Sequence, residues 1–205
     1  MAAESTTLVA TPYGDARMRY RGPASPRAML AIGHGAGGGT DAPDIAAAAQ
    51  VASERDVAVA LVEQPYRVAG RRAPAPAAQL DSAWRAVLAH LAAQVPVICA
   101  GRSSGARVAC RTAADVAAAA VLCLAFPLHP PGKAGDPAKS RLPELAGVAV
   151  PVLVVQGASD PFGIPAAAPG RQVVELRGNH SLRSDIPGLR AAVGTWLDQT
   201  LDSLR

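Results

Sequence analysis

Short apolar runs recur along the chain, and longer segments in which apolar residues follow a helical period lie between them. Such short runs predict strands that are buried on both faces of a sheet, because they leave no polar side to face water. The predicted strands cover residues 28–32, 57–62, 95–100, 117–126, 151–156 and 172–176. Residues 6–12 and 16–21 predict an opening hairpin, because a Tyr-Gly-Asp turn separates them.

Apolar residues that recur every three or four positions predict the helices. These cover residues 44–55, 77–94 and 187–204, and a further helix follows the strand at 95–100. His90 lies off the apolar stripe of its helix and is expected to face solvent. Strands that alternate with helices at this spacing predict an α/β fold with a mostly parallel, doubly wound sheet. We expect residues 1–205 to form a single domain.

The most informative motif is Gly101-Arg-Ser103-Ser-Gly105, where the strand at 95–100 meets its helix. In a G-x-S-x-G elbow the chain turns sharply, and glycine on both sides relieves crowding around the serine. Only Ser103 has glycine at both −2 and +2, so it is the predicted nucleophile. The N–H of Ser104 opens the helix and is a predicted oxyanion donor. The alternative is a chance match in a chain with 19 glycines.

A glycine-rich segment, residues 33–41, follows the strand at 28–32. It lacks the Gly-Lys-Ser/Thr ending of a P-loop, which argues against nucleotide binding. It matches the His-Gly-x-Gly loop that supplies the other half of an oxyanion hole. We expect the Ala36 N–H to be the second donor, with Gly37 as the alternative, and His34 to shape the loop or contact substrate. The other interpretation is a flexible turn.

A serine hydroxyl is a poor nucleophile, so it needs a base within hydrogen-bond reach and a carboxylate that orients this base. Of the four histidines, only His180 lies in a loop just beyond the last predicted strand. Asp160 directly follows a strong apolar strand, whereas Asp136 and Asp185 do not. Ligands bind at the carboxyl ends of the strands in such sheets. We therefore expect Ser103, Asp160 and His180 to form a catalytic triad.

Several basic residues stand in the loops expected near this site, and they favour an anionic substrate. They are Arg71, Arg72, Arg102 and Lys133. For the arginines of the 63–72 segment, a solvated basic loop is an equal alternative. His129, in a proline-rich loop at 127–133, is expected to line the pocket.

Composition adds several expectations. Half of the 205 residues are hydrophobic and only 3% are aromatic, so the core is expected to consist of small aliphatic side chains. The net charge is +4 and the arginines are spread along the chain rather than clustered, which argues against nucleic acid as a partner. The longest apolar run is too short to span a bilayer and the start lacks a signal pattern, so we expect a cytoplasmic protein without a membrane partner.

The remaining expectations concern the cysteines and the residue types that bind metals. Cys99, Cys110 and Cys123 stand in apolar surroundings and are expected to be reduced, buried and structural. His, Cys, Asp and Glu do not recur at metal-ligand spacing, so neither a metal nor a cofactor is expected.

Together these motifs resemble the α/β-hydrolase superfamily, within its dienelactone-hydrolase-like group. The greatest likeness is to the branch of testis-expressed and NSL-complex-subunit hydrolase-like proteins. The matching stretches, between about residues 30 and 183, are His-Gly-Ala-Gly-Gly, Pro-Tyr-Arg, Ala-Gly-Arg-Ser-Ser-Gly-Ala-Arg, Phe-Pro-Leu-His-Pro-Pro-Gly-Lys, Gln-Gly-Ala-Ser-Asp-Pro-Phe-Gly and Asn-His-Ser-Leu. The resemblance implies this fold without a substantial cap domain, and a triad of Ser103, Asp160 and His180. Dienelactone hydrolases use cysteine where this chain has Ser103.

These observations predict a serine hydrolase that cleaves small carboxylic esters or thioesters through an acyl-enzyme intermediate. The expected partner is a small ester, with the protein a monomer or homodimer. The alternative is a hydrolase fold kept as a binding or scaffolding module with weak or no catalysis. A covalent serine probe distinguishes the two, because an unactivated serine labels poorly.

Overall fold

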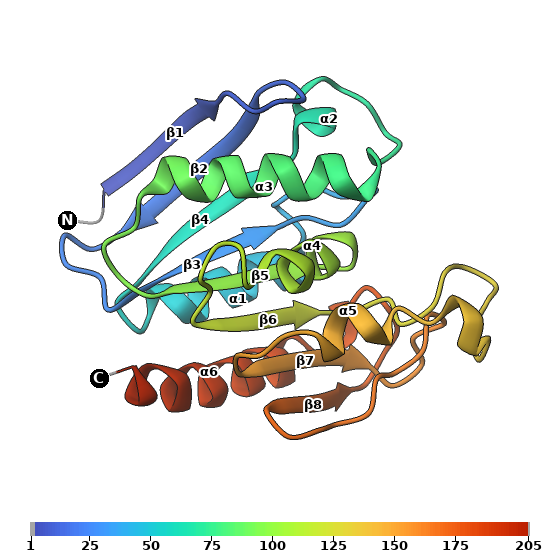
Figure 1. Cartoon of the computed structure of the whole chain (residues 1–205). Coiled ribbons are helices and arrows are strands. Elements are labelled where there is room, and N and C mark those ends of the chain that lie inside the picture. Colours follow the sequence, from blue (N-terminus) through green and yellow to red (C-terminus); the bar gives the residue numbers. More distant parts are fainter. Residues whose placement is uncertain (1–2, 205) are drawn as a thin grey trace.

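The computed structural model describes residues 3–204, which form an eight-stranded sheet of order β1-β2-β4-β3-β5-β6-β7-β8 (Figure 1). Strand β2 pairs antiparallel with β1 and with β4, and the pairs from β4 through β8 are all parallel. The strands are β1 (Ala3–Val9), β2 (Ala16–Gly22), β3 (Ala28–Gly33), β4 (Val57–Glu63), β5 (Val97–Arg102), β6 (Ala120–Leu124), β7 (Val152–Gly157) and β8 (Arg171–Leu176). The predicted hairpin and parallel sheet are confirmed.

Helices cover both faces of the sheet, as a doubly wound fold requires (Figure 1). The helices are α1 (Pro43–Ser53), α2 (Pro65–Val68), α3 (Ala77–Leu91), α4 (Ser104–Thr112), α5 (Leu142–Ala146) and α6 (Ile186–Ser203), with 3₁₀ turns η1 (Pro137–Lys139) and η2 (Arg183–Asp185). Helices α1 and α6 pack on one face, and α3 and α4 pack on the other. Within residues 3–204, none of these helices is long and apolar enough to cross a membrane.

Each face of the sheet has its own apolar core, and small aliphatic side chains dominate both. Trp196 of α6 lies in the first core and Trp84 of α3 in the second. The three cysteines are free and buried, as predicted. The exposed position of His90 on α3 also agrees with the sequence analysis.

Element boundaries differ from the prediction where the backbone reverses. Ala92 adopts the left-handed conformation, so α3 ends at Leu91 rather than at the predicted residue 94. Strand β6 is shorter than the predicted 117–126 run, because Ala117 and Ala125 flank it with φ of 49° and 52°. The short helices α2 and α5 lie in segments that the apolar pattern left as loops, because one turn of helix is too short to show a period.

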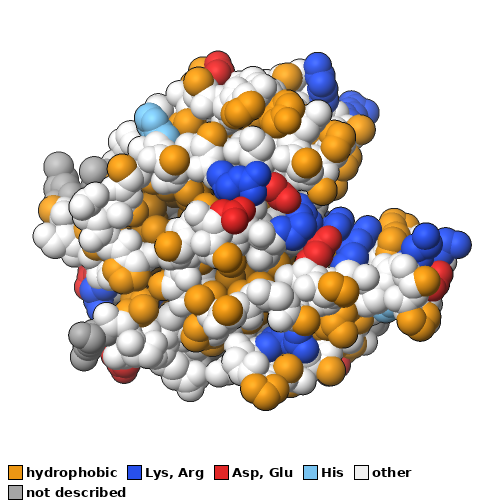
Figure 2. Space-filling view, in the orientation of Figure 1, with side chains coloured by type: hydrophobic (Ala, Val, Ile, Leu, Met, Phe, Trp, Pro, Cys, Tyr) orange, Lys and Arg blue, Asp and Glu red, His pale blue; other side chains and the backbone are white. Residues whose placement is uncertain are grey.

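An ion-pair network joins α3, α4 and α5 on the surface above the second core. Arg111 of α4 binds Asp81 of α3 and Glu144 of α5, and Arg107 of α4 also binds Glu144. Burial raises the pKa of Glu144, but the two arginines outweigh this effect and lower the pKa overall. Figure 2 shows basic and acidic side chains side by side over this part of the molecule. The network therefore ties the helix that follows Ser103 to both of its neighbours.

The packing of the core predicts a large difference between two leucines. Leu153 of β7 is fully buried, whereas Leu8 of β1 is 56% exposed. Leu153→Ala should lower the free energy of unfolding by about 2–5 kcal/mol, because it leaves a cavity. Leu8→Ala should change it by only about 0.5 kcal/mol. Urea unfolding of both variants measures the difference, and equal losses would contradict this description of the core.

Candidate active site

Ser103 stands at a sharp turn between β5 and α4. Its φ is 53°, which non-glycine residues rarely adopt, and its N–H donates to the Leu124 carbonyl at 2.9 Å. The flanking glycines make this turn possible. A Cβ on Gly101 would collide with the backbone of Gly105, and a Cβ on Gly105 would lie 2.7 Å from the Gly33 carbonyl oxygen. The main chains around Ser103 thus pass too close together for a side chain at either glycine, and this close packing maintains the unfavourable φ of Ser103.

A hydrogen-bonded chain runs from Ser103 through His180 to Asp160. The Ser103 Oγ lies 2.8 Å from His180 Nε2, and His180 Nδ1 lies 2.7 Å from Asp160 Oδ2. The Asp160 side chain is buried, whereas the His180 side chain is 17% exposed. Because a carboxylate accepts, Nδ1 carries the proton and leaves Nε2 free to accept from the serine hydroxyl. This arrangement can remove the serine proton and hold an imidazolium.

Several contacts keep Asp160 and His180 in place. Asp160 Oδ1 accepts from the Phe162 N–H at 2.9 Å, and Oδ2 accepts from Gln156 Nε2 at 2.7 Å. The Phe162 ring packs edge-on against the His180 imidazole, with centroids 4.4 Å apart. The carboxylate is therefore held by donors on both oxygens, and one of these oxygens also contacts His180. Sequence analysis missed Gln156, because its contact depends on the loop that folds back from β7.

The glycine-rich loop lies beside Ser103, and side chains of the protein bind two of its carbonyl oxygens. His34 Nδ1 lies 2.7 Å from the Gly35 oxygen, and the Tyr66 hydroxyl donates to the Ala36 oxygen at 2.9 Å. In a trans peptide the N–H points opposite to the carbonyl. The N–H groups of Ala36 and Gly37 are therefore turned away from these two side chains. Among residues 3–204 neither has an acceptor, so both stay available.

His34 is a buried structural residue, and both of its ring nitrogens are occupied. Besides the Gly35 contact, its Nε2 accepts from the Gln64 N–H at 3.0 Å, and the side chain is 3% exposed. These partners require a proton on Nδ1 and none on Nε2. Burial lowers the pKa of His34, in keeping with a neutral ring. Because both nitrogens are engaged within the protein, these contacts favour the expectation that His34 shapes the loop over the expectation that it contacts substrate.

The other predicted substrate residues lie in different surroundings. Arg102 binds Asp44 and the His180 carbonyl, so its guanidinium is engaged inside the protein rather than presented to a ligand. Arg71 lines a cavity of about 250 Å³ with residues of the β1–β2 turn, α2 and α3. His129 is buried, and its main-chain N–H donates to the Phe162 main-chain oxygen. Thus His129 packs behind the Asp160 loop.

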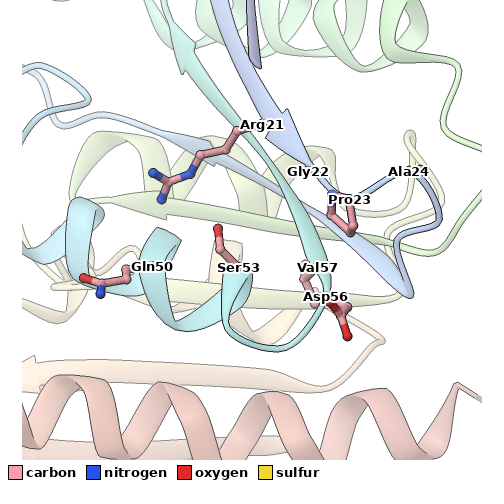
Figure 3. A pocket seen from close by; sticks show the side chains of 8 residues that line it. All are labelled: Arg21, Gly22, Pro23, Ala24, Gln50, Ser53, Asp56 and Val57. Atoms are coloured by element: carbon pink, nitrogen blue, oxygen red, sulfur yellow. The ribbon is translucent and has the colours of Figure 1, made fainter. Parts of the chain in front are cut away.

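A separate cavity of about 460 Å³ lies between β2 and α1. Figure 3 shows Arg21 reaching from β2 toward Gln50 and Ser53 of α1. Val57, which begins β4, also lines it, so this cavity is at the amino ends of the parallel strands. Ser103 follows the carboxyl end of β5, at the opposite edge of the sheet. The part of the chain described here holds no cluster of three or more His, Cys, Asp or Glu placed for a metal ion.

Comparison with protein families matches residues 26–183 to the family described as "Alpha/beta hydrolase domain". The match covers most of the chain and includes the elbow, Asp160 and His180. The chain therefore belongs to this α/β-hydrolase family. A search of curated proteins finds no significant match.

Solved structures with the same fold are distant in sequence. A Xanthomonas campestris protein described as an α/β serine hydrolase without lid is 20% identical, with a TM-score of 0.76 over 96% of this chain and 94% of its own. Est1E from Butyrivibrio proteoclasticus is 15% identical, with a TM-score of 0.74 over 96% and 99%. A dienelactone hydrolase from Anabaena variabilis is 18% identical, with a TM-score of 0.71 over 100% and 99%. At these identities the likeness shows the shared fold.

The elbow predicts a strict requirement at one glycine. Gly101→Ala should lower the free energy of unfolding by about 2–3 kcal/mol, because the new methyl group overlaps the Gly105 backbone. Gly38→Ala is the matched control, since a Cβ there has no atom within 4 Å. Urea unfolding measures the stability of both variants. A Gly101→Ala variant as stable as the control would contradict the close contact between the Gly101 and Gly105 main chains.

The buried His34 predicts a pH-dependent stability. Its unfolded pKa is about 6.5, and its folded pKa is lower because of burial. Below about pH 6.5 the unfolded chain therefore binds a proton that the folded state resists. Stability from this residue is complete above pH 6.5 and decreases as the pH falls through the folded pKa.

Urea unfolding between pH 4.5 and 7.5 tests this. We expect His34→Gln to be less stable at neutral pH but to lose less stability on acidification than wild type. His90→Gln, at an exposed position on α3, is the matched control. Parallel pH curves for wild type and His34→Gln would contradict the prediction.

Proposed function

We propose that the chain is a serine hydrolase that cleaves small carboxylic ester or thioester bonds. The observation that carries this proposal is the hydrogen-bonded chain Asp160–His180–Ser103, with its 2.7 Å and 2.8 Å contacts at a strained elbow. The proposal includes a single domain that acts without a cofactor, as a monomer or homodimer in the cytoplasm. It also includes membership of the testis-expressed and NSL-complex-subunit branch, on the basis of the motifs quoted above.

In this mechanism Ser103 Oγ attacks the carbonyl carbon while His180 Nε2 takes the hydroxyl proton. Asp160 keeps the imidazole in the required tautomer and stabilises the imidazolium. The tetrahedral intermediate collapses when His180 returns the proton to the leaving alcohol or thiol, which leaves an acyl-serine. Water, deprotonated by the same histidine, then attacks the acyl carbon and releases the acid.

The negative charge of the tetrahedral oxygen needs N–H donors in place before the reaction. We assign the Ser104 N–H as one donor, because it opens α4 directly after the nucleophile. The second donor is the Ala36 N–H, with Gly37 as the alternative. The hydrogen bonds from His34 and Tyr66 support this assignment, because they orient the two peptide planes that carry these N–H groups.

The mechanism predicts which variants lose activity toward p-nitrophenyl acetate and butyrate. Ser103→Ala and His180→Ala should lower kcat by about 10⁴- to 10⁶-fold, and Asp160→Asn by about 10⁴-fold. Ser203→Ala and His90→Ala, on α6 and α3, are the matched serine and histidine controls and should keep wild-type rates. Fluorophosphonate labelling should be confined to Ser103. A wild-type protein that neither hydrolyses esters nor labels at Ser103 would favour the alternative binding or scaffolding module.

A further inference from the structure

Arg102 immediately precedes the nucleophile, yet its side chain faces the interior. Its Nε donates to Asp44 Oδ2 at 2.8 Å, and the Asp44 side chain is only 1% exposed. Asp44 lies in the first turn of α1, where its other oxygen accepts from the Ile45 N–H at 3.0 Å. A carboxylate this deeply buried needs a charged partner, because an unpaired buried charge is strongly destabilising. Asp44 and Arg102 thus hold each other in a fixed position.

The same guanidinium contacts two parts of the candidate site. Arg102 Nη2 donates to the main-chain oxygen of His180 at 3.2 Å. Its Nη1 lies against Gly35, where a Cβ would be 2.8 Å from Nη1 and 3.5 Å from Ser103 Cβ. One planar group therefore joins the start of α1, the glycine-rich loop and the loop that carries His180. Arginine suits this task, since its donors form a rigid fork that lysine does not have.

We propose that Arg102 is a positioning residue for His180, held in place by Asp44, and that it does not select substrates by charge. This inference rests on the proposed function, because it concerns how well His180 serves Ser103. Elsewhere the loop is anchored on either side of His180: the Gly178 oxygen accepts from the Ser159 N–H at 2.9 Å, and the Leu182 side chain is buried in the first core. The Arg102 hydrogen bond fixes the His180 backbone itself. Loss of this bond lets the imidazole drift from Ser103 Oγ.

The two possible roles of Arg102 have opposite kinetic signatures. A positioning residue changes kcat for every ester, whereas a charge-selecting residue changes KM for anionic esters only. We compare p-nitrophenyl acetate with the anionic mono-p-nitrophenyl succinate. Arg102→Met should lower kcat about 10- to 100-fold on both esters, since displacements of about 1 Å have effects of this size, with KM changed by less than about threefold.

Arg102→Met leaves the buried Asp44 carboxylate without its ion-pair partner, and the variant could unfold for that reason alone. A second variant keeps the test valid in that case. In Arg102→Met/Asp44→Asn the buried charge is gone, so the protein should fold, yet the bond to His180 is still absent. We expect it to be as slow as the single variant. Arg102→Lys should not restore the rate, because one ammonium cannot replace the fork. Arg190→Met removes a surface ion pair with Glu54 on the α6 side and should leave kcat unchanged.

Two results would overturn the inference: a folded double variant with wild-type kcat on both esters, or a rise in KM confined to the succinate ester. Either leaves the proposed function intact, because wild type remains active and dependent on His180. If wild type itself lacks activity, the crystal structure of the double variant decides. A displaced His180 supports the positioning role, and an unchanged 2.8 Å distance from Nε2 to Ser103 Oγ overturns it.

Discussion

The close crossing of β5, α4 and β3 is the constraint on which the rest of the site depends. Gly101, Gly105 and Gly33 bring three main chains together without intervening side chains. This contact forces Ser103 into its positive φ and places the glycine-rich loop next to it. The ion pairs from α4 to α3 and α5 keep the helix seated on the crossing. The strain at one residue is thus distributed over contacts from three helices and two strands.

The parts of the site that could be predicted from the sequence are those with a local cause. The elbow needs glycine at two fixed positions, and a parallel sheet brings the ends of its strands to one edge. These two rules sufficed to place Ser103, Asp160 and His180 together. The hairpin and the order of strands and helices were also predictable. Apolar runs, helical periods and turn residues are local patterns that do not depend on how the side chains pack.

The parts that could not be predicted depend on partners distant in the chain. Arg102 stands beside the nucleophile, and its charge favoured a role in substrate binding, but its partner Asp44 precedes it by 58 residues. Gln64 and His34 pair across 30 residues, so nothing local shows that both ring nitrogens are occupied. Tyr66 lies in a helix of only four residues, α2, that has no period to reveal it. Each of these roles exists only after the sheet has formed.

The β1–β2 hairpin lies before the part of the chain that matches the family, and it covers one side of β4. Strand β4 reads Val-Ala-Val-Ala-Leu-Val-Glu, an apolar strand without a charge until its last residue. Left at the edge of the sheet, such a strand would be a template for pairing with other molecules. With the hairpin in place the edge is β1, which carries Glu4 and several hydroxyl side chains. The hairpin therefore replaces an apolar edge strand with a more polar one on this side of the sheet.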